Sequence, residues 1–421
     1  MDPLKTALVL GGGGARGAYE AGVVAYLRQE LEPRLGRPLT LPILSGTSVG
    51  AMNACHLAAD AEDHRRQVRR LLEAWRGLEL NHVLHVRSAD LVRRITRELI
   101  GKPGGDQEHG GLVDPRGLRE LTLRTLNWPG IGRNLRAGHL DALAVSATQI
   151  ATGRTFTFIQ HAEQRTPPWS RDPHYIAQHA RIGPRHALAS AAIPLVFPPV
   201  RIGKSLFADG GIRLNVPLSP ALRLGADRVI VVSLRHPETP PPHPGDEIGY
   251  ATLPFLAGKT LNALTMDRTE QDLERLRRFN GLIDAGTRAF GPTFISVLNG
   301  ALAPHRKTPL RYVRNILVHP SEDLGRLAAE FARSAEFKRR ARGLSGHFIR
   351  RLAEREARSS ADLLSYLLID GGFAEVLIDL GRRDARALGE RWFDFFSDAP
   401  QCAAEEARFE HLRLGGTFEL A

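Results

Sequence analysis

The chain has 421 residues, 43% hydrophobic and 24% charged, which is enough for one large or two medium-sized globular units. No apolar run approaches the roughly 18 residues that a membrane-spanning helix needs, which argues against an integral membrane protein. Only Cys55 and Cys402 are present, which argues against a disulfide scaffold and a cysteine-based metal site.

The formal net charge is +11, from 57 basic and 46 acidic residues. A basic balance favours contact with an anionic membrane surface or with nucleic acid. Most of the basic residues are arginines scattered along the chain, so an arginine-rich proteome explains the balance equally well. The N-terminus has only a short apolar run before a glycine loop, which predicts a cytoplasmic protein without an export signal.

The first sixty residues alternate between strand and helix patterns. Strands are predicted at 5–10 ("KTALVL") and 39–46 ("LTLPILSG"), and helices at 17–32 and 49–59. This alternation predicts an α/β fold with a mainly parallel sheet and helices on its faces.

The next part of the chain, up to residue 235, contains more of both elements. Residues 60–135 are predicted helical around a polar, glycine-rich loop at 101–111. Downstream we expect two strands in 140–159 around Thr152-Gly153, a helix in 186–200 that stops before Pro194, a hairpin at 201–211 and a strand at 226–234.

Prolines interrupt the pattern at 235–247 ("RHPETPPPHPGDE") and predict a unit boundary. We expect a core unit at 1–235, a connection at 236–253 and a mainly helical region at 254–421 packed on the core. Within that region, helices are predicted at 254–279, 321–358 and 360–397, and a strand at 314–320 that returns to the sheet.

The glycine loop "GGGGARG" (11–17) follows a strand and opens a helix. Gly12, Gly14 and Gly17 fit a dinucleotide-binding pattern, but the next strand ends without the carboxylate that would hold a ribose. The alternative use of such a loop is to present backbone N–H groups to a developing oxyanion. Arg16 would then add positive charge near the mouth of the site, or act as an ordinary surface cation.

A serine stands between two glycines, Gly46-x-Ser48-x-Gly50, at a predicted strand-to-helix corner. This is the nucleophile-elbow pattern, in which side chains two residues before and after the serine would clash. The alternative is a serine that only caps the following helix.

A serine nucleophile needs a base, and two kinds are available. His186, His236, His243, His305 and His319 follow it in the chain, although none has a context that points to catalysis. Asp209-Gly210-Gly211 is the other candidate, an acidic residue at the end of a predicted hairpin. By itself it would be an ordinary turn.

The glycine loop, the serine corner and Asp209-Gly210-Gly211, in this order and at this separation, resemble the patatin-like phospholipase family. "ASAAIPLVFPPV" and "NVPLSPALRLGADRVIVVS" are similar to the core of that family, and "LAGKTLNAL", "HPSEDLGRLAAEFA" and "LLSYLLIDGGFAEVLIDLGRRDA" to the C-terminal half of bacterial members. The resemblance implies a three-layer core with a mainly parallel central sheet, plus a helical C-terminal region.

The resemblance also implies roles for individual residues. Ser48 would be the acyl-accepting nucleophile and Asp209 its base, with no histidine between them. Gly12, Gly13 and Gly14 would supply the oxyanion donors, Gly17 would permit close packing, and Arg16, Gly46, Gly50, Gly210 and Gly211 would complete the motifs. No metal or cofactor is implied.

The expected substrate is a lipid acyl ester, with glycerophospholipid first. A basic amphipathic stretch at 333–358 predicts either a helix on an anionic membrane, at the inner membrane face, or a solvated helix covering the core. No nucleic-acid partner is expected. A histidine-dependent α/β-hydrolase, a nucleotide-binding oxidoreductase and a catalytically silent membrane scaffold stay open as alternatives.

Overall fold

The computed structural model describes residues 4–80, 115–170, 172–194, 196–237, 269–304, 309–340, 346, 349–350 and 362–397. The predicted loop at 101–111, nearly all of the proline-rich segment, and most of the basic stretch at 333–358 lie outside these residues. Within them, no helix combines the length and the apolar character that crossing a bilayer requires.

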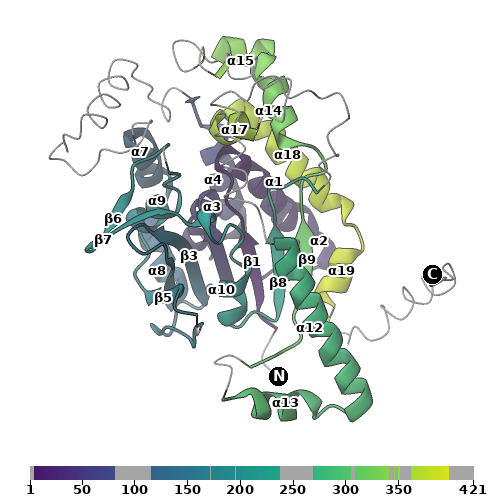
Figure 1. Ribbon diagram of the computed structural model, residues 1–421. Coiled ribbons are helices and arrows are strands. Elements are labelled where there is room, and N and C mark those ends of the chain that lie inside the picture. The colour runs from purple at the N-terminus through teal and green to yellow at the C-terminus, as the bar shows by residue number, and fades with distance from the viewer. Residues whose placement is uncertain are drawn as a thin grey trace, which may run out of the picture.

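The described residues form one nine-stranded sheet (Figure 1). Seven of its strands follow the order β5-β4-β3-β2-β1-β8-β9, and the β6–β7 hairpin joins the sheet through β3. The strands are β1 Thr6–Leu10, β2 Ile43–Thr47, β3 Ala142–Gln149, β4 Thr155–His161, β5 Tyr175–His179, β6 Val200–Ile202, β7 Ser205–Asp209, β8 Arg228–Val232 and β9 Arg314–Val318. The β3-β2-β1-β8-β9 run is parallel, and β4 and the β6–β7 hairpin pair antiparallel. The expected mainly parallel sheet is therefore present.

Alternate residues of the central strands face two separate cores, which is the period-two pattern of a sheet covered on both faces. Leu8 and Leu10 of β1 belong to the larger core, and Ala7 and Val9 to the smaller one. The larger core lies under α1 Ala18–Tyr26, α3 Val49–Ala59, α4 His64–Arg76 and α18 Gly371–Ala387, and the smaller under α10 Leu218–Arg223 and α12 Thr269–Phe290. The fold thus has three layers.

The remaining described elements are helical. They are η1 Gly14–Gly17, η2 Leu27–Leu31, α2 Glu32–Leu35, α7 Arg116–Thr125, α8 Trp128–Arg136, α9 Pro184–Ser190, η3 Gly210–Ile212, α13 Phe294–Leu302, α14 Leu324–Arg333, α15 Ala335–Arg340, α17 Asp362–Leu367 and α19 Arg391–Phe396.

The C-terminal elements pack against the N-terminal ones, as the yellow α18 beside the purple α1 shows (Figure 1). A Cβ on Gly22 would lie 2.0 Å from the Ile378 carbonyl oxygen, and one on Gly381 would lie 2.1 Å from that of Tyr19. The absence of side chains at these two glycines lets the two helix backbones come unusually close. The strand predicted at 314–320 is present as β9 and extends the sheet beside β8.

Several sequence-based boundaries differ from the structure. The helix predicted at 17–32 begins with the 3-10 turn η1 and has a π-helical section at η2, because the chain must turn off the glycine loop. The strand predicted at 39–46 begins only at Ile43, after Pro42. The helix predicted from 186 starts at Pro184 and ends at Ser190, four residues before Pro194. β5 was not predicted.

Candidate active site

The sheet brings Ser48 and Asp209 together across 161 positions of sequence. β2 and β7 both pair with the same edge of β3, one after the other. Thr47, the last residue of β2, is opposite Ser146, and Asp209, the last residue of β7, is opposite Ala147. The two strands therefore end head to head beside neighbouring residues of β3, and the residues at their ends meet.

The serine corner has the geometry of a strained elbow. Ser48 has φ 56° and ψ −125°, a backbone conformation that is unfavourable for a residue with a side chain. A Cβ on Gly46 would lie 2.3 Å from the Gly50 carbonyl oxygen, and one on Gly50 would lie 2.4 Å from that of Leu10. The two glycines are thus required by space, as the pattern predicts. The Ser48 side chain makes no capping hydrogen bond to α3, so a purely capping role is wrong.

Ser48 Oγ donates directly to Asp209 Oδ2 at 2.5 Å. The other carboxylate oxygen accepts from the Gly211 N–H at 2.7 Å, so the carboxyl group is fixed at both atoms. Both side chains are buried. Burial raises the pKa of Asp209 from 3.8 to about 7, which makes the carboxylate a far better base than an ordinary aspartate.

Ser190, at the end of α9, supports the elbow and was missed by the sequence reasoning. Its Oγ accepts from the Ser48 N–H at 2.8 Å and donates to the Ser146 carbonyl at 2.6 Å. This hydroxyl therefore links the nucleophile's backbone to β3. No local pattern around "ALAS" distinguishes it, because its partners come from other parts of the chain.

In the part of the chain that the structure describes, no histidine makes a hydrogen bond to Ser48 or Asp209. His186 accepts from the Gly183 N–H and packs edge-on against Phe158, and the ring nitrogens of His236 and His319 bond to the Pro320 carbonyl. His243 and His305 lie outside the described residues.

The glycine loop lies beside Ser48, but the Gly12 N–H is not available as the oxyanion donor that the resemblance implied. It donates to the Asn215 carbonyl at 3.1 Å, so it is already engaged. The N–H groups of Gly13 and Gly14 precede the first turn of a helix, where intrahelical carbonyls cannot accept from them. They are the remaining candidate oxyanion donors. A Cβ on Gly17 would lie 2.4 Å from Val49, so this glycine permits close packing on α3.

Arg16 is not a surface cation at the mouth of the site. It is buried, its Nε donates to Ser365 Oγ at 2.8 Å, and its guanidinium lies 4.2 Å from the centre of the Tyr366 ring. The space beside Gly14 is also filled by α17, because a Cβ there would lie 2.5 Å from the Tyr366 carbonyl oxygen. The C-terminal helix α17 thus covers the glycine loop, where a dinucleotide would otherwise have to bind.

An apolar cavity of about 110 Å3 opens at Ser48. Its walls come from α3, α4, α7, α17 and the segment that follows α9, and include Met52, Trp75, Leu121, Phe197, Leu367 and Ile369. A polar exception is His56, whose Nε2 lies 3.4 Å from Thr125 Oγ1. Burial lowers the pKa of His56 to about 4, so the ring is neutral at physiological pH. The cavity is suited to an uncharged, mainly apolar chain.

A buried polar network lies behind the glycine loop. The Glu20 carboxyl group is fully buried, and its Oε2 accepts from Asn53 Nδ2 at 2.8 Å. The same nitrogen donates to the Gly17 carbonyl, and Asn53 Oδ1 accepts from Trp75 Nε1. Burial raises the pKa of Glu20 well above its usual value. The network ties the loop-to-helix junction to α3 and α4.

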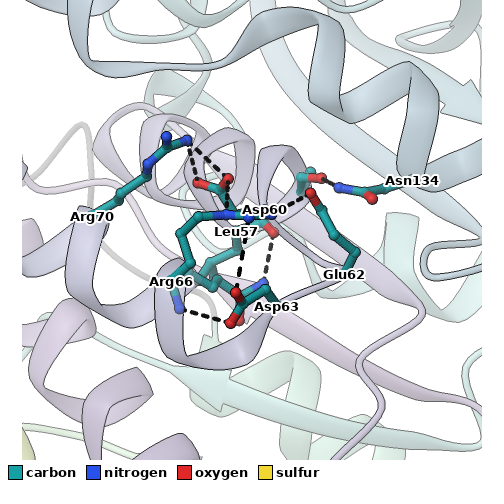
Figure 2. A network of polar contacts seen from close by, with 9 residues as sticks. Leu57, Asp60, Glu62, Asp63, Arg66, Arg70 and Asn134 are labelled. Atoms are coloured by element: carbon teal, nitrogen blue, oxygen red, sulfur yellow. Dashed lines mark hydrogen bonds and ion pairs between the residues drawn. The ribbon is translucent and has the colours of Figure 1, made fainter.

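The far end of α3 is held by ion pairs, shown in Figure 2. Asp60, buried at the C-terminal end of the helix, accepts from Arg66 Nε at 3.1 Å and from Arg70 Nη1 at 3.0 Å, both on α4. Asn134 of α8 donates to the Ala58 carbonyl at 2.9 Å. Because Ser48 directly precedes α3, these contacts fix the helix whose N-terminus carries the nucleophile.

Comparison with known proteins agrees with this geometry. The sequence model of the patatin-like phospholipase family matches residues 8–222, about half of the chain, and includes both Ser48 and Asp209. The chain belongs to this family. The match ends before the C-terminal elements, so α17 and the cavity wall that it provides lie outside the region shared with the family model.

Among individual proteins, the chain is similar to a cGAMP-activated phospholipase of Pseudomonas aeruginosa (strain BWHPSA011 / Pa011), 32% identical over 217 residues. The similar region is 51% of this chain, and spans 55% of that relative. Of solved structures, VipD from Legionella pneumophila aligns with a TM-score of 0.31 and 16% identity, and the alignment covers 89% of this chain and 67% of the VipD chain. The ExoU–SpcU complex of P. aeruginosa aligns with a TM-score of 0.25 and 15% identity, and the alignment covers 98% of this chain and 76% of the matched chain. Both TM-scores are too low to support an argument.

Proposed function

We propose that the chain is a lipid acyl hydrolase that works through a Ser48–Asp209 dyad. The observation that carries this proposal is the direct hydrogen bond from Ser48 Oγ to Asp209 Oδ2, made at a strained elbow beside a glycine loop. The apolar cavity that opens at the same serine supports an acyl chain as the part of the substrate bound there. Membership of the patatin-like phospholipase family supports the same reaction class.

The reaction proceeds through an acyl-enzyme. Ser48 Oγ attacks the acyl carbon while Asp209 takes its proton, and the carbonyl electrons move to the oxygen. The N–H groups of Gly13 and Gly14 hold this oxyanion. The alcohol then leaves and takes the proton from Asp209. A water molecule, activated by the same carboxylate, hydrolyses the acyl-enzyme and releases the fatty acid.

The substrate class we propose is a glycerophospholipid or lysophospholipid presented at a membrane surface. The net charge of +11 supports peripheral contact with anionic lipid.

The relative from P. aeruginosa is named for activation by cGAMP, which makes activation by this ligand a proposal for the present chain as well. It is tested by assaying the chain with and without cGAMP, and equal rates would contradict it.

The decisive experiment is product analysis on a panel of lipids with wild-type protein, Ser48→Ala and Asp209→Ala, together with a fluorophosphonate probe. We expect wild-type protein to release fatty acid and to be labelled at Ser48, and both variants to be folded and inactive. A wild-type protein that is folded but neither labelled nor active, with and without cGAMP, would instead support a silent scaffold. Activity that survives Asp209→Ala but is lost on replacement of a histidine would support the histidine-dependent alternative.

A further inference from the structure

The chain that follows Asp209 returns to the glycine loop at Asn215. The Asn215 carbonyl accepts from the Gly12 N–H at 3.1 Å. Two residues later, the Pro217 carbonyl accepts from Ser45 Oγ of β2 at 2.9 Å. This short segment is therefore fixed to the glycine loop after β1 and to the middle of β2, which gives Asn215 a defined position near Ser48.

Asn215 Oδ1 and the Ser48 side chain both lie against the bare face of Gly12. The position that a Cβ would take on Gly12 is 2.5 Å from Asn215 Oδ1 and 3.1 Å from Ser48 Cβ. Oδ1 is buried and has no hydrogen-bond partner in the part of the chain that the structure describes. A buried polar atom without a partner is uncommon in a folded protein, and beside a nucleophile it suggests a contact that is completed by substrate.

The two sides of Ser48 differ in character. The apolar cavity is lined by Ser48, Gly14 and Ala15, whereas Gly12 and Asn215 are not part of its wall. An ester whose acyl tail enters the cavity, with its carbonyl carbon at Ser48, must direct its alcohol half away from that cavity. Asn215 provides an amide on the side of the serine that the cavity does not occupy.

We propose that Asn215 is a substrate-contacting residue that hydrogen-bonds the alcohol half of a glycerol ester. An amide both donates and accepts, which matches the hydroxyl and ester oxygens that neighbour the scissile bond in glycerol lipids. The proposal rests on the acyl hydrolase function proposed above. The amide transfers no proton. While the Ser48 Oγ–carbon bond forms and the carbon–alcohol bond breaks, it holds the departing alcohol in line for the proton on Asp209.

The test compares two esters that share one acyl chain and differ in the alcohol: a monoacylglycerol and a p-nitrophenyl ester. Loss of one hydrogen bond in Asn215→Leu should lower kcat/KM for the monoacylglycerol by about tenfold, and for the p-nitrophenyl ester by less than about twofold. Asn215→Asp, similar in size, keeps an acceptor oxygen at this position and should lose less on the monoacylglycerol than Asn215→Leu does. Fluorophosphonate titration of Ser48 gives the active fraction, so misfolded protein does not enter these ratios.

The matched control is Arg213→Ala. Arg213 lies on the same segment, is exposed, and donates to the Gly153 carbonyl. It should leave both rates unchanged if Asn215 acts by contact and not by loosening the segment. Equal losses on the two esters in the Asn215 variants, or no loss on either, would overturn the assignment. A wild-type protein that is neither labelled nor active on either ester would refute the proposed acyl hydrolase function itself, and the role of Asn215 with it.

Discussion

At the scale of single residues, the site depends on a carboxyl group that the fold has removed from water. An exposed aspartate has a pKa near 3.9 and is too weak a base to assist a serine. Asp209 reaches about 7 because burial penalises its charged form more than the hydrogen bonds from Ser48 and Gly211 favour it. This desolvation costs the folded protein stability once the group is ionised.

Asp209→Asn tests both consequences. The wild-type rate should rise as the pH increases through about 7, where the base becomes unprotonated, and Asp209→Asn should lower kcat by about 10²–10⁴-fold. Because the folded state binds this proton more tightly than the unfolded chain does, the stability it contributes is complete below about pH 4 and is lost as the pH rises through about 7. The melting temperature of Asp209→Asn should therefore rise relative to that of the wild type between pH 5 and pH 8. A constant difference in melting temperature would contradict this.

Ser190→Ala tests the support of the elbow. It would leave the Ser48 N–H, now paired at 2.8 Å, without its acceptor, and we expect a loss of about 1–3 kcal/mol in unfolding free energy together with a lower kcat. Ser205→Ala is the control, because its hydroxyl accepts from Gln149 at the other end of β7. Chemical denaturation and steady-state kinetics should show a kcat loss in Ser190→Ala alone. An unchanged kcat in Ser190→Ala would show that the elbow holds its shape without this hydroxyl.

At the scale of elements, the short helix α17 connects the C-terminal region to the catalytic loop. It contributes the partners of Arg16 and also Leu367, in the wall of the cavity. We infer that α17 holds the loop in the shape that presents its N–H groups to substrate.

Arg16 and Ser365 test this coupling in a double-mutant cycle. Arg16→Ala removes both the hydrogen bond and the ring contact and should lower kcat/KM clearly, whereas Ser365→Ala should have a smaller effect. Because the two side chains touch, the double variant should lose less than the sum of the single losses. Additive effects on kcat/KM, measured on one ester substrate, would show that the contact does not act through the loop.

At the scale of the whole molecule, the C-terminal region belongs to the same sheet and helix layers as the candidate site. β9 extends the sheet, and α19 lies beside that edge, where Arg228 and Arg314 donate to the Ser397 carbonyl at the end of the helix. α18 packs on α1, the helix that leaves the glycine loop.

Gly381→Ala tests this packing. Its Cβ would lie 2.1 Å from the Tyr19 carbonyl oxygen, so α1 and α18 must separate, and we expect a loss of about 1–3 kcal/mol in unfolding free energy. Gly300→Ala on α13 is the matched control, since its Cβ meets nothing within 4 Å and should stabilise the helix by about 0.5–1 kcal/mol. Chemical denaturation should therefore show a lower unfolding free energy for Gly381→Ala and a higher one for Gly300→Ala. A neutral Gly381→Ala would mean that the helix pair tolerates separation.

Local patterns in the sequence were sufficient for much of this protein. Short apolar runs predicted the central strands, a run of small residues predicted α3, and the glycine spacing around Ser48 predicted a corner where side chains do not fit. These features depend on residues a few positions apart, so the sequence contains their physical cause. Ordered motifs then indicated the family, and with it the pairing of Ser48 with Asp209.

Tertiary structure alone decided the rest. That Gly12 pairs with Asn215, that Arg16 is buried under α17, and that Ser190 bonds to the elbow are contacts between residues distant in the chain. A glycine or an arginine has the same local pattern whether its partner is water, substrate or another helix. Its role is fixed only when strands and helices from both ends of the chain pack together and decide which polar groups are still available to a ligand.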